Sequence, residues 1–152
     1  MIEVITFDLD DTLWDVRPAL IKAEAAQNLW LDTHYPNTIS ELGAEDLKRI
    51  RRDVLTREPQ LAHRISAFRQ AVLQQSLEET GLATAEAEWA AKEAFGAFIA
   101  RRHDVALYPE SLPLLEELAQ DYILGALTNG NADVTKTPLG RFFDFALKAE
   151  DV

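Results

Sequence analysis

Two short apolar segments that end in polar loops constrain this chain more than any other feature. Residues 2–7 (IEVITF) are rich in β-branched and aromatic side chains and stop at the acidic run DLDD. Residues 122–127 (YILGAL) form a similar apolar run and are followed directly by Thr-Asn-Gly. Such runs are typical of short buried strands. A weaker candidate covers residues 143–147, after a turn and an expected short helix, which gives the strand-helix-strand order of a parallel sheet.

A long helical interval separates the first two strands. Residues 17–103 contain no alternating run and are dense in Ala, Leu, Glu, Gln and Arg, which favour helices. Three breaks divide the interval into about four helices: residues 36–38, residues 58–59 and Gly81. An amphipathic helix over residues 109–120 is expected to cover the sheet. We therefore predict an α/β core, formed by residues 1–16 and 104–152, with an all-helical block inserted over residues 17–103.

The bulk composition excludes several classes of protein. The chain has 152 residues, of which 47% are hydrophobic and 27% charged, as in an ordinary globular domain. A formal charge of -11 argues against nucleic-acid binding, which depends on Lys and Arg. The absence of cysteine excludes disulfides and thiolate sites and fits a reducing cytoplasm. Because the start lacks a secretory signal, we expect a cytoplasmic protein whose working chain begins at Met1, with no membrane partner.

The loop after the first strand holds two carboxylates. Asp8 and Asp10 are separated by one residue, and the Thr12 hydroxyl follows closely. Mg²⁺ takes carboxylate oxygens and keeps several waters or phosphate oxygens, so this cluster suits that ion. A polar turn with an Asp that caps a helix would explain the same residues.

A second polar cluster follows the second strand. Thr128 and Asn129 precede Gly130, which has no side chain to keep backbone amides away from a ligand. A Thr-Asn-Gly turn after a strand is common by itself. In an open parallel sheet, however, ligands bind beyond the carboxyl ends of the strands. We therefore expect the two clusters to meet at one crevice.

These motifs resemble a known superfamily. FDLDDTL followed by LTNG is similar to the first two motifs of the haloacid dehalogenase (HAD) superfamily, and the helical block resembles the cap that many members insert between them. The runs TFDLDDTLWDVRPAL and GALTNGNADV are most similar to bacterial flavin mononucleotide and sugar-phosphate phosphatases. The resemblance spans the chain. It implies a three-layer Rossmann-like core with an all-α cap, and Mg²⁺-dependent hydrolysis of a small phosphorylated metabolite.

The resemblance also implies a role for each motif residue. Asp8 would attack phosphorus to form an aspartyl-phosphate, and Asp10 would protonate the leaving oxygen and then activate water. Both would hold the metal, Asp10 through its backbone carbonyl. Thr12 would support the phosphate-binding loop and orient Asp10. Residues 128–130 would hold the phosphoryl oxygens through the Thr128 hydroxyl and two backbone amides.

Residues near or within the cap are candidates for substrate contact. His63, Arg64 and Arg69 lie on an expected helix, where Arg could pair with an anionic or planar group. Solvation or contacts within the cap would explain them more simply. Trp14 and Asp15 follow the acidic loop and could form a hinge or flap that admits substrate, although Trp14 could equally belong to the core.

Two later HAD motifs are not found in the sequence. The resemblance implies a Lys, usually followed by Pro, and an acidic pair after another buried strand. Lys136 and Lys148 do not match that pattern, and we expect both at the surface. Without the compensating cation, Asp8 and a bound phosphate repel each other. We therefore expect this chain to be a truncated form that is weakly active or inactive alone.

The same resemblance makes the sheet incomplete. In the superfamily the first strand is central, whereas here residues 2–7 would form an edge. An exposed apolar edge invites pairing with another chain. We therefore predict a homo-oligomer, strand exchange or completion by a separate polypeptide.

Two other functions are alternatives to the phosphatase. A catalytically dead HAD-like module could retain the crevice and cap and act through partner proteins. A phosphoacceptor signalling domain also uses an acidic cluster and Mg²⁺, but the motif spacing and the large helical insertion fit it badly.

Overall fold

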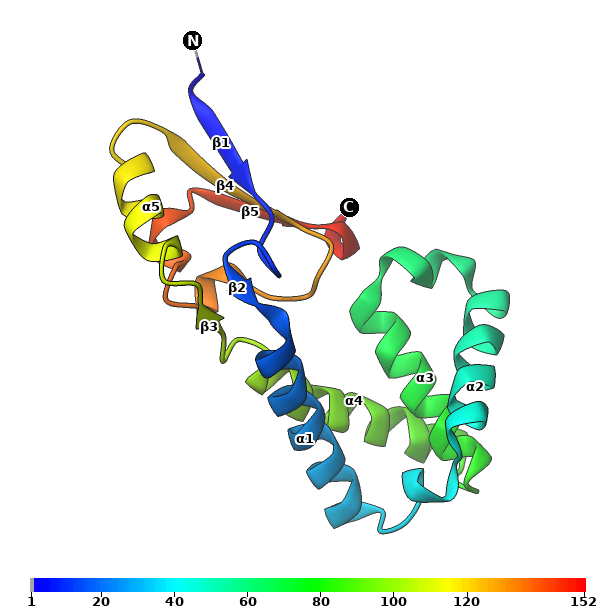
Figure 1. Ribbon diagram of the computed structural model, residues 1–152. Coiled ribbons are helices and arrows are strands. Elements are labelled where there is room, and N and C mark those ends of the chain that lie inside the picture. The colour runs from blue at the N-terminus through cyan, green and yellow to red at the C-terminus, as the bar shows by residue number, and fades with distance from the viewer. Residues whose placement is uncertain (1) are drawn as a thin grey trace. The chain divides into compact units, whose positions relative to one another are not determined.

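The computed structural model describes residues 2–152, which form two compact units (Figure 1). The core unit joins the residues up to Lys22 with Arg101–Val152. The helical unit is Ala23–Ala100. Helices α1 (Val16–His34) and α4 (Thr84–Arg101) carry the chain from one unit to the other.

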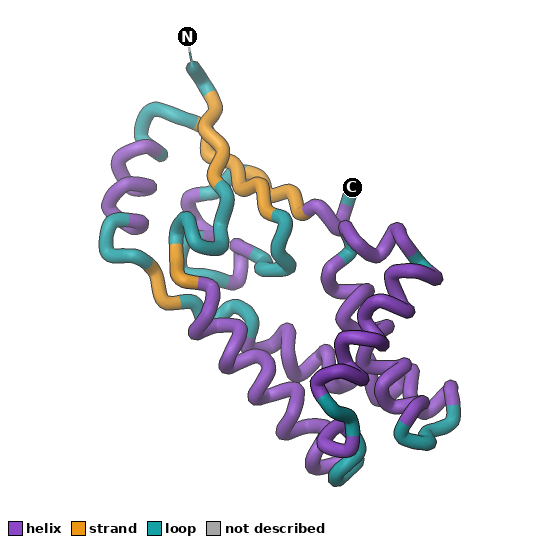
Figure 2. The backbone as a smooth tube through the Cα atoms, turned by 45° about the vertical axis from the view of Figure 1, so that its right-hand side comes forward, coloured by secondary structure: helices purple, strands orange, loops and turns teal. Residues whose placement is uncertain are grey.

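The core unit is built on a three-stranded parallel sheet, which confirms the predicted α/β class. Strands β1 (Val4–Phe7), β4 (Ile123–Thr128) and β5 (Phe145–Lys148) pair in the order β1-β4-β5. Figure 2 draws all strands of the protein in orange. The register places Phe7 opposite Ala126 and Thr128 opposite Lys148. All three carboxyl ends therefore lie at one edge, and β1 and β5 are the outer strands.

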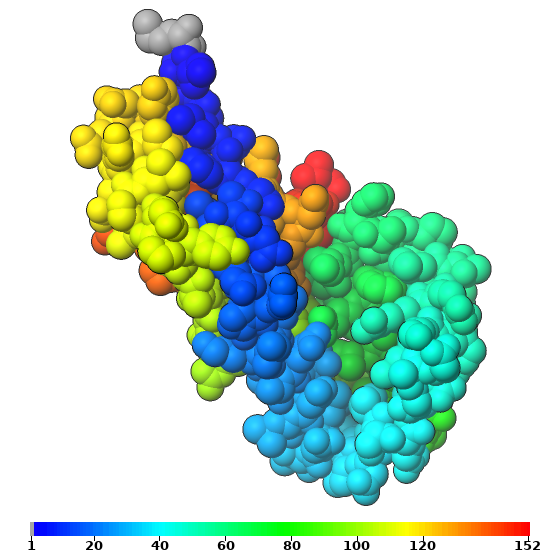
Figure 3. All heavy atoms as spheres, viewed as in Figure 1, coloured from blue at the N-terminus to red at the C-terminus, as the bar shows by residue number. Residues whose placement is uncertain are grey.

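The two faces of the sheet differ in burial because strand side chains alternate in direction. On one face, Leu115 of α5 (Ser111–Leu118) packs with Leu124 and Ala126 in the main core cluster. Figure 3 shows the yellow atoms of α5 beside the blue atoms of β1. The strands also leave a set of large apolar side chains exposed: Val4, Ile123, Leu127, Phe145 and Leu147.

Two parts of the core unit differ from the sequence prediction. The expected short helix before the third strand is replaced by two 3₁₀ turns, η3 (Val134–Lys136) and η4 (Gly140–Phe142). Pro138 lies between them and has no N–H to continue a helix. A small antiparallel pair, β2 (Trp14–Asp15) with β3 (Ala106–Leu107), was not predicted.

The helical unit adds α2 (Ala44–Arg57) and α3 (Ile65–Glu79), so four α-helices fill the interval in which about four were expected. The short 3₁₀ turns η1 (Ile39–Glu41) and η2 (Pro59–His63) flank α2. Arg49 ties α2 to α3 through an ion pair of 2.6 Å with Glu79. Among residues 2–152, none of the helices has the length and apolar character needed to cross a membrane.

Candidate active site

The loop after β1 is a tight turn with a fixed backbone. The Thr12 amide donates to the Leu9 carbonyl over 3.2 Å, and the Asp11 amide donates to the Trp14 carbonyl over 2.8 Å. Asp11 has φ 59, a left-handed conformation that few residues other than Gly adopt. Its carboxylate accepts the Val16 amide at 3.1 Å, so it caps the start of α1. This supports a structural role for the Asp11 side chain.

Asp8 lies at the carboxyl end of the sheet with an exposed side chain. It lines a cavity of about 380 Å³ together with Thr128 and Asn129 from the end of β4. The remaining lining residues are Leu127, Leu147, Ala149 and Val152. The structure therefore brings the two sequence motifs to one crevice, as the strand ends predicted.

The Asp10 carboxylate is held on both of its oxygens. The Trp14 indole Nε1 donates to Oδ1 at 2.8 Å, and Arg102 Nη2 lies 2.5 Å from Oδ2. Arg102 is 2% exposed and also donates from Nε to Asn131 Oδ1 at 3.0 Å. A Cβ at Gly130 would lie 2.5 Å from Asp10 Oδ2, so the carboxylate occupies the space that a side chain there would need.

The sequence did not single out Arg102 or Asn131. Arg102 directly follows an Ala-rich helix that ends in another arginine, where a basic residue normally faces water. Its partner Asp10 is far away in the sequence. Only the tertiary structure shows which of the two adjacent arginines is buried.

Three further residues that the sequence analysis considered for the site are Thr12, Thr128 and Trp14, and their environments differ. The Thr12 side chain is exposed, and its hydroxyl has no hydrogen bond among the contacts of residues 2–152, so Trp14 and Arg102 support Asp10 instead. The Thr128 hydroxyl accepts the Gly130 amide at 3.0 Å. Trp14 is fully buried in the core cluster, the alternative left open by the sequence.

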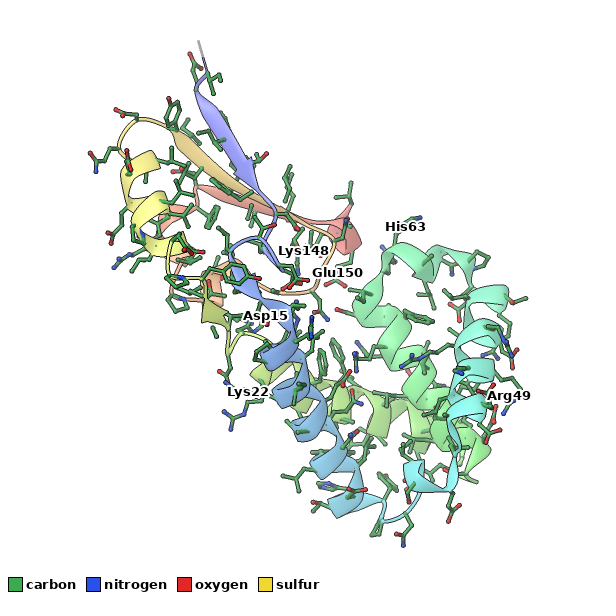
Figure 4. The ribbon with its side chains drawn as sticks, viewed as in Figure 1. Asp15, Lys22, Arg49, His63, Lys148 and Glu150 are labelled. Atoms are coloured by element: carbon green, nitrogen blue, oxygen red, sulfur yellow. The ribbon has the colours of Figure 1, made fainter. Side chains whose placement is uncertain are left out.

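Asp15 lies at the start of α1, where Figure 4 labels it. Its carboxylate accepts the Arg17 amide at 3.0 Å. The residue therefore helps to begin the helix, and it belongs to the small β2–β3 pair.

Arg69 and His63 belong to the helical unit. Arg69 forms an ion pair of 3.3 Å with Glu24, and its guanidinium lies 4.0 Å from the centre of the Phe98 ring. It also lines a cavity of about 520 Å³ within this unit. His63 is exposed at the end of η2, as Figure 4 shows.

The two lysines near the end of the chain differ in environment. Lys136 is exposed, as expected. Lys148 lies at the end of β5 with 28% of its side chain exposed. Its Nζ lies 3.6 Å from Glu150 and 3.4 Å from Asp151, and Figure 4 labels Lys148 and Glu150 in this segment. These two acids hold the lysine at the strand end.

The segment after Asn131 is anchored by Asp133. Its amide donates to His103 Nε2 at 2.9 Å, and its carboxylate accepts the Thr135 hydroxyl at 2.6 Å. The hydrogen bond from that hydroxyl holds the pKa of Asp133 below its ordinary value, with further lowering from the Thr135 amide and Lys136. Ionised Asp133 therefore caps η3.

The groups that could bind a metal ion at this site are carboxylate and carbonyl oxygens. The Asp8 carboxylate and the Asp10 backbone carbonyl follow one another at the end of β1, and such oxygens are the ligands that Mg²⁺ prefers. Within the described part of the chain, no three His, Asp or Glu side chains gather in a group that could hold a metal. The Asp8 carboxylate and the Asp10 carbonyl therefore fit Mg²⁺ in kind.

The fold and this crevice define an α/β protein with a helical insertion and an acidic loop at the carboxyl edge of a parallel sheet. Residues 2–152 match the family model described as haloacid dehalogenase-like hydrolase. The chain belongs to this family of hydrolases, which confirms the resemblance seen in the sequence.

Three known proteins are similar to this chain. The chain is 33% identical over 148 residues to the 5-amino-6-(5-phospho-D-ribitylamino)uracil phosphatase YigB of Escherichia coli K12, covering 97% of this chain and 62% of that protein. The solved 2-haloacid dehalogenase from Pseudomonas syringae pv. Tomato DC3000 is 46% identical with a TM-score of 0.91, covering 99% of this chain and 65% of that one.

The third protein is similar in fold. The HAD-hydrolase YfnB of Bacillus subtilis, solved bound to magnesium, is 19% identical with a TM-score of 0.57, covering 99% of this chain and 64% of that one. The chain thus spans less than two thirds of the length of each of these three proteins.

Proposed function

We propose that this protein hydrolyses phosphate monoesters of small metabolites through an aspartyl-phosphate on Asp8. The observation that carries the proposal is the pairing of two different carboxylates in one loop. Asp8 is exposed to the strand-end cavity, whereas Asp10 is held by two side-chain donors. A nucleophile needs access to the substrate, and a proton donor needs a fixed position.

The proposed reaction has two steps. In the first, an Asp8 carboxylate oxygen forms a bond to phosphorus while the ester P–O bond breaks, and the leaving oxygen takes a proton from Asp10. In the second, Asp10 accepts a proton from water, whose oxygen bonds to phosphorus as the bond to Asp8 breaks. The products are the alcohol and inorganic phosphate, and both carboxyl groups return to their starting states.

The end of β4 supplies groups for the phosphoryl oxygens. Thr128 and Asn129 line the cavity with Asp8, so the Thr128 hydroxyl and the Asn129 amide are the proposed donors. Mg²⁺ would be held by the Asp8 carboxylate and the Asp10 backbone carbonyl. When bound, it would reduce the repulsion between Asp8 and the phosphate.

Dehalogenation is a second candidate, favoured by the 46% identity to the Pseudomonas syringae 2-haloacid dehalogenase. In that reaction Asp8 would attack carbon and displace a halide. A halide leaves without taking a proton, so Asp10 would be needed only as the base that activates water in the second step. A phosphate ester would use Asp10 in both steps because its leaving oxygen is basic, and the two donors that fix Asp10 suit that double role.

A hydrolysis assay separates these reactions. The protein is supplied with Mg²⁺ and either nitrophenyl phosphate or a chlorinated propionate, and phosphate and halide release are measured. The phosphorylated ribitylaminouracil of the Escherichia coli relative is the first metabolite to add. We expect slow phosphate release, in keeping with a chain that is weakly active alone, and loss of that release in Asp8→Asn. Halide release alone would establish the dehalogenase.

A binding or assembly module remains the non-enzymatic alternative. The same assay tests it, because equal rates for the native protein and Asp8→Asn would remove Asp8 as the nucleophile. Absence of turnover together with specific capture of a partner protein would replace the enzymatic proposal.

A further inference from the structure

Arg102 is a buried cation to which the proposed reaction assigns no role. Its side chain is 2% exposed, and its guanidinium contacts Asp10 through Nη2 and Asn131 through Nε. A buried charge is strongly unfavourable unless it is paired and hydrogen-bonded. Burying Arg102 in the core unit therefore costs free energy, which its contacts must offset. Its carboxylate partner, Asp10, is the proposed acid and base.

The contacts around Asp10 fix its orientation from three sides. Arg102 lies 2.5 Å from one oxygen, and the Trp14 indole donates to the other at 2.8 Å. Gly130 closes the third side, because a Cβ there would lie 2.5 Å from the carboxylate. Rotation of the Asp10 side chain would break both hydrogen bonds.

We propose that Arg102 is a positioning residue, which orients Asp10 for proton transfer and is itself oriented by Asn131. The inference rests on the proposed function, since the proton transfer belongs to that reaction. The planar guanidinium can bond Asn131 through Nε and Asp10 through Nη2 at once. A lysine ammonium is a single point of charge and lacks this fixed fork.

The two side chains that donate to Asp10 lie next to the helices that join the two units. Arg102 directly follows α4, and Trp14 lies just before α1. These helices carry both connections between the core unit and the helical unit. The two hydrogen bonds that orient Asp10 thus come from core residues close in sequence to α1 and α4.

The first test compares leaving groups. Arg102→Met is assayed with phenyl phosphate, whose leaving oxygen needs a proton, and with dinitrophenyl phosphate, whose leaving oxygen does not. General acid catalysis is worth about 10²–10⁴-fold. We therefore expect kcat to fall at least about tenfold further with phenyl phosphate than with dinitrophenyl phosphate. Equal loss on both substrates would overturn the positioning role.

The control is the neighbouring arginine. Arg101 is 63% exposed, and its ion pair with Asp104 lies at the surface. Arg101→Met removes the same charge from the adjacent position and is expected to leave the ratio of the two rates unchanged. Arg102→Lys keeps the buried charge and serves where Arg102→Met does not fold. Its rate with dinitrophenyl phosphate should approach the native rate, while that with phenyl phosphate stays low.

The second test does not depend on turnover. Trp14 is one of three tryptophans, so its indole N–H resonance can be assigned by comparison with Trp14→Phe. We expect this resonance to shift in Arg102→Met or Arg102→Lys, because Asp10 is no longer held, and to stay in place in Arg101→Met. An unchanged resonance in both Arg102 variants would overturn the inference. A shifted resonance in a protein without hydrolysis would uphold the contact and reject the proposed function.

Discussion

Replacing Gly130 with alanine tests whether the Asp10 carboxylate occupies the place that the structure gives it. A Cβ at this position would lie 2.5 Å from Asp10 Oδ2, and 3.4 Å from both Arg102 Nη2 and Thr128 Oγ1. Ordinary van der Waals contact begins near 3.4 Å, so the carboxylate oxygen must retreat by about 0.9 Å. The other two neighbours can remain where they are.

The cost of this retreat follows from the bonds that it disturbs. Asp10 Oδ2 accepts from Arg102 over 2.5 Å, and a displacement of this size lengthens or breaks that bond. A hydrogen bond to a charged group is worth about 1.5–3 kcal/mol. We therefore expect Gly130→Ala to lower the free energy of unfolding of the core unit by about 1.5–3 kcal/mol.

Urea denaturation measures the effect, with Gly96→Ala as the matched control. Gly96 lies within α4, and a Cβ there would meet nothing within 4 Å. Alanine in an open helical position stabilises by about 1 kcal/mol, so the control should have the opposite sign. A Gly130→Ala variant that loses less than about 0.5 kcal/mol would refute the placement of Asp10 against this glycine.

Three further predictions concern other parts of the core unit. Because the pKa of Asp133 is lowered by its Thr135 hydrogen bonds, its stabilising effect is present above the ordinary pKa of an aspartate and is lost as the pH falls through the lowered value. Asp133→Asn should therefore flatten the acid side of a stability-pH profile measured by urea unfolding. Leu124→Ala, at a fully buried position, should lower the free energy of unfolding by about 2–5 kcal/mol, whereas Leu127→Ala, 43% exposed, should change it by less than about 1 kcal/mol in the same experiment. The exposed apolar side chains of the sheet and its outer strand β1 predict self-association, which sedimentation velocity should detect and Leu127→Lys with Leu147→Lys should reduce; a stable monomer of the native protein would count against it.

The strands were predictable because their sequences carry a local signal. A β-branched and aromatic run that stops at acids marked residues 2–7, and the structure places β1 at Val4–Phe7. The motif at residues 122–127 became β4, one residue further along. Parallel strand ends share an edge, so the meeting of Asp8 with Thr128 followed from these two assignments.

The support of Asp10 was not predictable, because it depends on contacts between distant residues. Trp14 and Leu107 pair in strands of only two residues, too short for any periodic pattern. Arg102 follows another arginine, and nothing local distinguishes the buried side chain from the exposed one. Only the tertiary structure shows that Trp14 and Arg102 hold the carboxylate of Asp10, the proposed acid and base.

The Asp8 nucleophile is the central claim. Isotope transfer locates the bond that water cleaves, and trapping of the phosphorylated Asp8 tests the claim most directly. The protein hydrolyses a phosphate ester in heavy-oxygen water, and the peptide that contains Asp8 and the released phosphate are analysed by mass spectrometry. If Asp8 attacks phosphorus and water then cleaves the acyl-phosphate at phosphorus, the first turnover releases phosphate with a single heavy oxygen from water. The Asp8 carboxylate itself remains unlabelled at that stage.

Trapping the intermediate separates this route from direct attack by water, which gives the same label in phosphate. Acid quenching during turnover, followed by borohydride reduction, converts an aspartyl-phosphate to homoserine at that position. We expect homoserine at position 8 in the native protein and none in Asp8→Asn. Steady release of phosphate without any trapped product at Asp8, under conditions that trap a known aspartyl-phosphate, would contradict it.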